Sequence, residues 1–253
     1  MFKLDTTHTA YLIGISDEGY VGHAYYGRRL KGFGGKYRLR MEEPPFTPSV
    51  NKREKNSFLD CFPMEYSTGG VGDYRESCLN VRNESGSMGS ELLYESHEVS
   101  EGKPALPGLP ASFGERGDVE TLEIVLRDTA LELKVILSYS VFEREDVITR
   151  NVRIENEGTG SLRLEKMLSA CLDMDNRDFE MLTLCGSWAR ERYIQRNRIC
   201  PGKQLVSSTK GESSHQEHPF LALVTPEAAQ ETGEVYAMHF VYSGNFMAQA
   251  EVT

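Results

Sequence analysis

The stretch VETLEIVLRDTALELKVILSYSVFEREDVITRNVRIENEG (119–158) decides the fold class. Apolar residues recur at every second position, which is the period of a β-strand. A helix over the same residues would bury Glu132 and Lys134. The segments RDTA (127–130) and EREDV (143–147) have the polar composition of turns. The stretch therefore predicts three antiparallel strands that form a sheet with one buried face and one solvent-exposed face. The alternating apolar residues are Val119, Leu122, Ile124 and Leu126, then Leu131, Leu133, Val135, Leu137, Tyr139 and Val141, then Ile148, Val152 and Ile154.

The same pattern extends outward in both directions from this stretch. Alternating or β-branched runs bounded by Gly, Asp, Asn and Ser occupy 8–15, 19–27, 91–100, 161–174, 234–244 and 245–253. Many short strands with almost no amphipathic helix predict an all-β fold, a large antiparallel two-sheet β-sandwich with little helix. The last two runs predict a hairpin whose second strand is still alternating at Thr253, as in a piece of a longer protein.

Two segments interrupt the strand pattern. MEEPPFTPSVNKREKNSF (41–58) holds three prolines and alternating charges, and GKPALPGLPASFGERGD (102–118) is rich in proline and glycine. Long loops inside a compact domain are usually functional or disordered. We expect 41–58 to form an extended surface arm, and we call it the arm.

Composition limits the function classes. The 253 residues carry 28 Lys and Arg against 38 Asp and Glu, a formal net charge of -10. Nucleic-acid affinity depends on cations that displace counterions, so general nucleic-acid binding is not expected. No apolar run is long enough to span a membrane, and the start MFKLDTTHTAYLIG does not resemble a signal peptide. We therefore expect a soluble, cytoplasmic protein with no membrane partner.

Five cysteines stand at 61, 78, 171, 185 and 200. Their number is odd and no pair has CxxC spacing, which favours reduced thiols over a disulfide framework or a zinc site. His215 and His218 are three residues apart, but Pro219 follows and disfavours a helix there. We expect these histidines to form hydrogen bonds at a loop or interface, and we expect no metal.

An unusual cluster lies in GSWARERYIQR (186–196), which contains the chain's only tryptophan, Trp188. Arg190, Arg192 and Arg196 surround it. Three interpretations remain open from the residues alone: a nucleic-acid patch, which the acidic net charge disfavours, a sugar-binding aromatic platform, or the wall of a larger enzyme.

Paired carboxylates are the machinery of glycoside hydrolysis. Candidates are Glu65, Asp73, Asp173 and Asp175, but the sequence cannot place any two of them opposite each other. We expect each to be a surface or turn residue.

Several segments together resemble one family. They are GHAYYGRRL (22–30), SHEVSEGKPALPGLPASF (96–113), DVITRNVRIENEG (146–158), GSWARERYIQR (186–196), KGESSHQEHPFLAL (210–223) and GEVYAMHFVYSGNF (233–246). In this order and spacing they are similar to the N-terminal domain of the α-galactosidases of glycoside hydrolase family 36.

The resemblance implies a three-part enzyme: an N-terminal β-supersandwich, which residues 1–253 cover except for its last strands, then a central (β/α)8 barrel and a small C-terminal β domain, neither of which is in this chain. The two catalytic aspartates belong to the barrel, so it implies no catalytic residue in this chain. The implied reaction removes terminal α-1,6-galactose from melibiose, raffinose and related oligosaccharides with retention, through a covalent intermediate. No metal or organic cofactor is implied.

The resemblance also implies partners. Members often form homotetramers in which the N-terminal domain of one subunit reaches the active-site mouth of another. The arm looks like the segment that does so, with Glu43, Arg53 and Lys55 as substrate-binding residues. The following segment, SFLDCFPMEYSTGGVGDYR (57–75), departs from the relatives' SLDTLxQEYPxYGxxDFR.

The same context makes Trp188, Arg190, Arg192 and His215 interface residues toward the chain's own catalytic barrel, because Arg pairs well with carboxylates and Trp offers a large contact area. Two alternatives are an autonomous carbohydrate-binding β-sandwich module and a different hydrolase with its own carboxylate pair.

Overall fold

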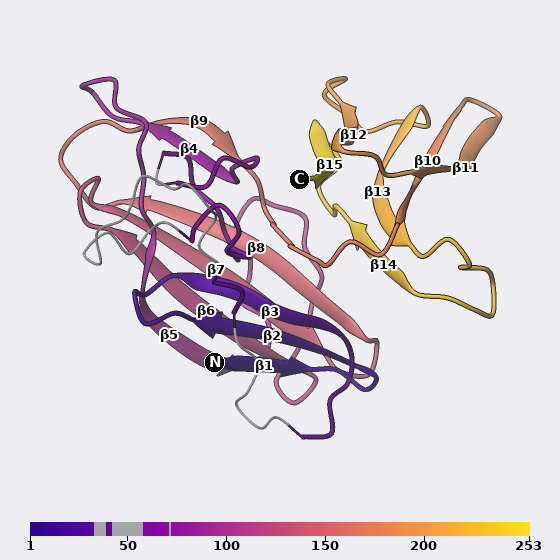
Figure 1. Cartoon of the computed structure of the whole chain (residues 1–253), viewed down its shortest axis with the longest axis horizontal. Helices are drawn as coiled ribbons and strands as arrows, with labels where there is room; N and C mark the ends of the chain where they lie inside the picture. Colours follow the sequence, from indigo (N-terminus) through magenta and orange to yellow (C-terminus); the bar gives the residue numbers. More distant parts are fainter. Residues whose placement is uncertain (33–38, 42–57, 71) are drawn as a thin grey trace. The chain divides into compact units, whose positions relative to one another are not determined.

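The computed structural model describes residues 1–32, 39–41, 58–70 and 72–253. These residues form antiparallel β-sheets and no helix (Figure 1). The prediction of an all-β sandwich with little helix is confirmed. The chain divides into two compact units, unit 1 (Met1–Ala105 with Ser112–Met174) and unit 2 (Leu106–Ala111 with Asp175–Thr253).

The decisive stretch lies in the largest sheet of unit 1. This sheet has the order β5-β6-β7-β8, with antiparallel registers that pair Val119 with Phe142 and Leu133 with Asn156. The predicted three-stranded meander is confirmed, and the loop 102–118 connects β5 to β6. The strands are β5 (Leu93–Glu101), β6 (Val119–Asp128), β7 (Leu133–Phe142) and β8 (Val147–Asn156).

The central strand β7 corrects one expectation. Its apolar face is buried as predicted. Ile136, Ser138 and Ser140 at the centre of the opposite face are also buried, so only the two ends of that face are partly exposed to solvent. Polar groups on that face have partners in β6: the hydroxyls of Ser140 and Thr121 lie 2.8 Å apart, and Ser138 donates to Glu123 at 2.7 Å. Short hydroxyl side chains can therefore be buried there without leaving an unsatisfied polar group.

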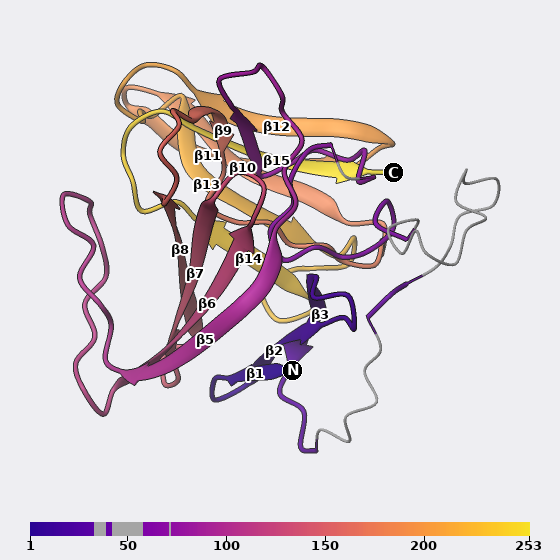
Figure 2. The ribbon, with the colours of Figure 1, turned by 90° about the vertical axis from the view of Figure 1, so that its left-hand side faces the viewer.

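A second sheet completes the sandwich of unit 1. One apolar cluster joins residues of β2 (Tyr11 and Ile13) to residues of β6 and β7 (Ile124 and Val135), so it forms the core between the two sheets. Figure 2 shows this sheet, β1-β2-β3, alongside the strands of the large sheet. Its strands are β1 (Phe2–Asp5), β2 (Thr9–Ile15) and β3 (Val21–Arg28), and a two-stranded sheet pairs β4 (Leu79–Arg82) with β9 (Arg163–Met167).

The segment 58–64, which begins at the last residue of the arm, packs on the second sheet. Phe58, Leu59 and Phe62 are buried together with Tyr20. A Cβ atom on Gly22 would lie 2.7 Å from the Phe62 ring, so a glycine is needed for this close approach. The segment 58–64 is therefore a fixed part of the core.

Unit 2 consists of a four-stranded sheet and a two-stranded sheet. The orders are β11-β10-β13-β14 and β12-β15, and Met181, Val206, Leu221 and Phe246 form a core between the sheets. The strands are β10 (Glu180–Ser187), β11 (Arg190–Arg198), β12 (Gly202–Ser208), β13 (Glu217–Val224), β14 (Val235–His239) and β15 (Phe246–Val252).

The predicted hairpin of 234–253 is wrong. β14 pairs with β13, whereas β15 pairs with β12 in the other sheet. The chain leaves the first sheet after His239 and enters the second at Phe246, which is buried against Met181 and Leu221. Burial of the Phe246 ring between the sheets thus selects a sheet crossing instead of a tight turn.

Candidate functional site

Trp188 lies at the turn of the β10–β11 hairpin and is 84% exposed. Tyr193 and Ile194 in β11 are also exposed, at 61% and 69%. β11 is an edge strand, and every one of its residues is exposed. Trp188 is therefore not part of the core, and a large aromatic surface is exposed to solvent.

The backbone of the hairpin turn requires unusual geometry. The register shifts between Cys185 and Ser187, and a Cβ atom on Gly186 would lie 2.0 Å from the carbonyl oxygen of Arg190. Ala189 and Arg192 both adopt positive φ angles, 61° and 60°. Non-glycine residues in this conformation are uncommon and signal a constrained turn.

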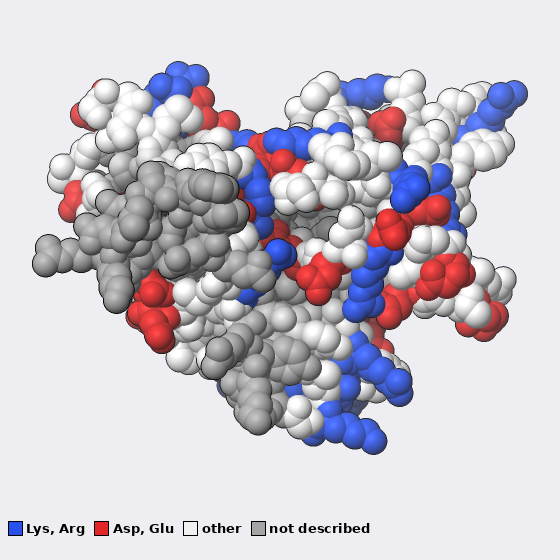
Figure 3. Space-filling view, viewed as in Figure 1, with Lys and Arg blue, Asp and Glu red and all other residues white. Residues whose placement is uncertain are grey.

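The predicted interface residues gather at this turn. The amide of Ala189 donates to the Glu191 carboxylate at 2.8 Å. This hydrogen bond is the main reason that the pKa of Glu191 lies below its usual range, and the charges of His215 and Arg192 lower it further. Figure 3 shows Lys and Arg side chains over the region of this hairpin. We call Trp188, Arg190, Arg192, Tyr193 and His215 the hairpin surface.

The loop before β13 adjoins the hairpin surface. The amide of Gly186 donates to the Gln216 carbonyl, and the His218 and His239 rings meet edge to face with centroids 5.5 Å apart. Partial burial, followed by the nearby Arg192 charge, lowers the pKa of His218. A neutral imidazole is favoured there, which suits hydrogen bonding.

The arginines of GSWARERYIQR do not share one role. Arg196 donates to the carbonyls of Ala228 (2.7 Å), Thr225 (2.8 Å) and Pro226 (2.7 Å), and it pairs with Glu180. It therefore anchors the loop after β13. The side chains of Arg190 and Arg192, by contrast, make no hydrogen bond or ion pair within the described part of the chain.

The arm residues Glu43, Arg53 and Lys55 lie outside the described residues, so their predicted substrate contacts remain a prediction.

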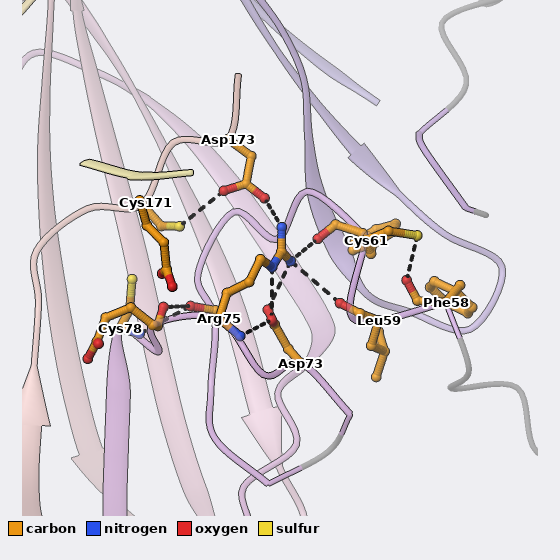
Figure 4. A network of polar contacts seen from close by, with 12 residues as sticks. Phe58, Leu59, Cys61, Asp73, Arg75, Cys78, Cys171 and Asp173 are labelled. Atoms are coloured by element: carbon orange, nitrogen blue, oxygen red, sulfur yellow. Dashed lines mark hydrogen bonds and ion pairs between the residues drawn. The ribbon is translucent and has the colours of Figure 1, made fainter. Parts of the chain in front are cut away.

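A polar network that the sequence did not reveal lies next to the end of the arm (Figure 4). Arg75 forms a bidentate pair with Asp73, through Nε to Oδ1 (2.9 Å) and Nη2 to Oδ2 (3.0 Å), and its Nη1 donates to Asp173 at 2.7 Å. Its Nη2 also donates to the Phe62 carbonyl at 2.6 Å, with the Leu59 carbonyl at 3.5 Å. Burial raises the pKa of Asp173, although the Arg75 charge opposes this.

Glu65 is the centre of a second network. Its side chain is fully buried, and its Oε1 accepts from Tyr11 (2.6 Å) and Tyr139 (2.7 Å) and pairs with Arg150 at 2.9 Å. Burial raises the pKa of Glu65, but the Arg150 charge and the hydrogen bonds bring it below its usual value. The Glu65 Oε2 and His23 Nδ1 atoms lie 3.7 Å apart, and neither has a hydrogen-bond partner among the described residues.

These networks correct the expectation for the carboxylates. Glu65 and Asp73 are buried, not surface or turn residues, and Asp73 and Asp173 face the same guanidinium. A retaining glycosidase needs two carboxyl groups facing a glycosidic bond. In this geometry the carboxylates instead neutralise arginines. The sequence signal that was available is the DYR tripeptide (73–75), whose acid and base lie two residues apart.

The cysteines and the possible metal ligands offer no disulfide and no metal site within the described residues. None of the five cysteines forms a disulfide, and Cys78 is buried. Within the described ranges, no three His, Cys, Asp or Glu side chains form a group that could hold a metal ion. Nor does that part of the chain contain a helix able to cross a membrane.

Comparison with known proteins identifies the family. Residues 19–253 match the family model of the glycosyl hydrolase family 36 N-terminal domain. The chain is 39% identical over 252 residues to α-galactosidase AgaA of Geobacillus stearothermophilus, and 40% identical over 253 residues to the bifunctional α-galactosidase/sucrose kinase AgaSK of Mediterraneibacter gnavus. These alignments cover 99% of the chain but only 35% and 27% of the relatives.

Solved structures give the same result. The crystal structure of AgaA in complex with stachyose superimposes with a TM-score of 0.94 at 39% identity, and the galactosidase domain of AgaSK with 0.92 at 40%. Each match covers 99% of this chain and 35% of the other. The chain thus spans about a third of these relatives, and it belongs to the family of N-terminal domains of glycoside hydrolase family 36, whose relatives are α-galactosidases.

Proposed function

We propose that this chain is the non-catalytic N-terminal domain of a retaining α-galactosidase, which hydrolyses terminal α-1,6-galactose in melibiose- and raffinose-type oligosaccharides. The observation that carries the proposal is identity of 39% and 40% over almost the whole chain to two α-galactosidases, both far longer than it. Structures of AgaA bound to raffinose and to stachyose support this substrate class.

The proposed role of the domain is to support a catalytic barrel, to mediate assembly into a homotetramer and to shape the active-site mouth of a neighbouring subunit. The hairpin surface supports the first part. Trp188 and two arginines without carboxylate partners among the described residues are suited to contact an acidic partner surface. In this proposal Trp188, Arg190, Arg192 and His215 contact the barrel, and Glu43, Arg53 and Lys55 contact substrate.

The division of labour can be tested directly. The 253-residue chain is expected to show no turnover of p-nitrophenyl α-galactoside, whereas the full-length protein turns it over. Turnover by the chain that survives repurification would refute a non-catalytic domain.

The arm is tested in the full-length protein. Lys55→Ala is expected to lower kcat/KM for raffinose while leaving the melting temperature unchanged. An unchanged kcat/KM would contradict a role of Lys55 in the active site.

A second candidate function, an autonomous carbohydrate-binding module, is favoured by one observation. Trp188 and Tyr193 are both exposed, and aromatic rings are the usual stacking surface for sugars. Titration of the chain with raffinose, followed by the fluorescence of its only tryptophan, separates the two candidates. Saturable quenching that disappears in Tyr193→Ala would favour the binding module, and no change would favour the barrel contact.

A further inference from the structure

Two of the five cysteines, Cys78 and Cys171, come together in the core of unit 1. Cys78 directly precedes β4, and Cys171 follows β9, the strand that pairs with β4. The Leu168 amide donates to the Cys78 carbonyl at 2.8 Å, and the Cys78 thiol donates to the Ala170 carbonyl at 3.7 Å. Both cysteines belong to the same apolar cluster, and Figure 4 shows their sulfur atoms one above the other. The strand pairing therefore brings together two thiols that lie far apart in the sequence.

The two thiols are hydrogen-bonded to each other, and their surroundings make them unequal. This hydrogen bond is the main reason that the pKa of the Cys78 thiol is lowered; burial opposes the shift, whereas hydrogen bonds from Ser67 and the Arg150 charge add to it. The same bond, followed by burial, raises the pKa of the Cys171 thiol. The Arg150 guanidinium also donates to the Cys171 carbonyl at 2.8 Å, so a cation lies beside the pair. Cys78 is thus the thiol that ionises first, and a thiolate is the nucleophilic form of cysteine.

We propose that Cys78 and Cys171 form a redox-active dithiol, which a peroxide oxidises to an intramolecular disulfide. The Cys78 thiolate attacks one oxygen of hydrogen peroxide, the O–O bond breaks, and Cys78 becomes a sulfenic acid. The hydroxide that leaves takes up the proton released by Cys78. The Cys171 sulfur then attacks the Cys78 sulfur, the S–O bond breaks, and the hydroxyl leaves as water with the Cys171 proton. In total two thiols lose two electrons, and the peroxide is reduced to two waters.

The burial of the pair limits which oxidant reaches it. Cys78 is 2% exposed and Cys171 is partly buried, whereas Cys200 is exposed. Hydrogen peroxide is close to water in size, so it is better suited to this site than a bulky disulfide such as oxidised glutathione. Cys200 serves as the internal reference for free access. The disulfide would hold the segment that carries Asp173 against the start of β4.

Trypsin places the two cysteines on separate peptides. Cleavage after Lys and Arg gives ESCLNVR (76–82) and MLSACLDMDNR (167–177), each with one cysteine. A disulfide between Cys78 and Cys171 is therefore visible by mass spectrometry as one linked pair of peptides, also in the full-length protein.

The experiment treats the native full-length protein with hydrogen peroxide, blocks remaining thiols with N-ethylmaleimide in denaturant, and maps the linked peptides. We expect the pair 76–82 with 167–177 to be at least about tenfold more abundant than any pair with Cys61, Cys185 or Cys200, because contact gives the two thiols a high effective concentration. Dithiothreitol added before blocking should remove the pair. Oxidised glutathione should produce much less of it than peroxide.

Serine variants separate the roles of the two cysteines. In Cys171→Ser the Cys78 sulfenic acid has no thiol with which to condense, so dimedone should label peptide 76–82. In Cys78→Ser, peptide 167–177 should remain largely unlabelled, because the pKa of the Cys171 thiol is raised. Cys200→Ser is the matched control and should leave the linked pair of the parent protein unchanged.

Three results would overturn the inference or part of it. Absence of the linked pair at a peroxide concentration that oxidises Cys200 would refute the dithiol. A pair that forms equally well when the protein is unfolded in urea would show that the fold does not direct the reaction. Equal dimedone labelling in Cys78→Ser would refute the order of the two steps. Should Cys78→Ser not fold, the parent and Cys171→Ser still decide the first two points. None of these results depends on α-galactosidase activity, so the proposed function is tested separately.

Discussion

Arg150 in unit 1 and Arg192 in unit 2 both lie in β-strands, yet their surroundings are opposite. The Arg150 side chain is 15% exposed and binds Glu65, two tyrosine hydroxyls and the Cys171 carbonyl. Arg192 is exposed, and its side chain has no hydrogen-bonded partner among the described residues. Unit 1 thus uses arginine to neutralise its own buried acids, whereas the hairpin surface of unit 2 presents arginine outward. Arg192 is therefore a better candidate than Arg150 for contact with a partner, because its charge is not neutralised within the fold.

The largest effect that this comparison predicts is at Arg150. Arg150→Met keeps most of the side-chain volume but leaves the Glu65 carboxylate buried without its cation. Breaking a buried pair in this way typically costs about 3–5 kcal/mol. Urea unfolding of the 253-residue chain should show this loss, and equal stability of variant and parent would break the comparison.

The control is Arg153→Met in the same strand. Arg153 is largely exposed and pairs with Glu155 at 3.0 Å, and exposed ion pairs contribute only about 0–1 kcal/mol. A similar loss for both substitutions would indicate that β8 is sensitive to any change, not to the buried charge.

The pH dependence of stability provides the second test. The pKa of Glu65 is lower in the folded chain than its ordinary value, so the unfolded chain binds the proton more readily. The stabilisation by Glu65 is complete above the unfolded pKa of about 4.3 and is lost as the pH falls through the folded value.

Glu65→Gln should therefore be less stable than the parent at pH 7, and the difference should shrink as the pH falls below about 4. Unfolding free energies from pH 7 down to pH 3 measure it. Asp173 has a raised pKa and contributes with the opposite sign, but it is present in both proteins and cancels in the difference. A difference that is constant with pH would contradict the assignment.

A smaller effect is expected from Arg196, whose side chain is bound within the fold, unlike those of Arg190 and Arg192 in the same stretch. It donates to three carbonyls in the loop after β13, so Arg196→Leu should lose about 1–3 kcal/mol. Amide hydrogen exchange should become faster around Ala228 and stay unchanged in β6 and β7. If hydrogen exchange around Ala228 does not change, Arg196 does not anchor this loop. Its side chain would then resemble that of Arg190, and the contrast with the buried Arg150 of unit 1 would become sharper.

The sequence predicted much of unit 1, because its strands alternate strictly. It predicted β14 and β15 but not their partners, because pairing depends on which sheet buries Phe246. The residue pattern also marked Trp188 as unusual. It did not reveal the networks of Glu65 and Arg75, because their partners come from segments as much as 98 residues apart. Such ion pairs are set by tertiary packing and leave no local pattern in the sequence.

The smallest expected effect on folding, and the sharpest test of the hairpin surface, is at Trp188. Because the side chain is 84% exposed, Trp188→Ala should change the unfolding free energy of the chain by no more than about 0.5 kcal/mol. In the parent chain the fluorescence of Trp188 should be quenched by acrylamide as readily as that of a free indole.

The second test uses the full-length protein. If the hairpin surface contacts a barrel, Trp188→Ala in the full-length protein should lower the melting temperature, since a large aromatic contact is lost only when the partner is present. Arg198→Ala is the matched control, because Arg198 lies in the adjoining exposed strand β11 and pairs weakly with Asp178 at 3.4 Å. Equal melting temperatures for the full-length parent and its Trp188→Ala variant would mean that the tryptophan serves no domain contact, and the carbohydrate-binding interpretation would then be the better account of its exposure.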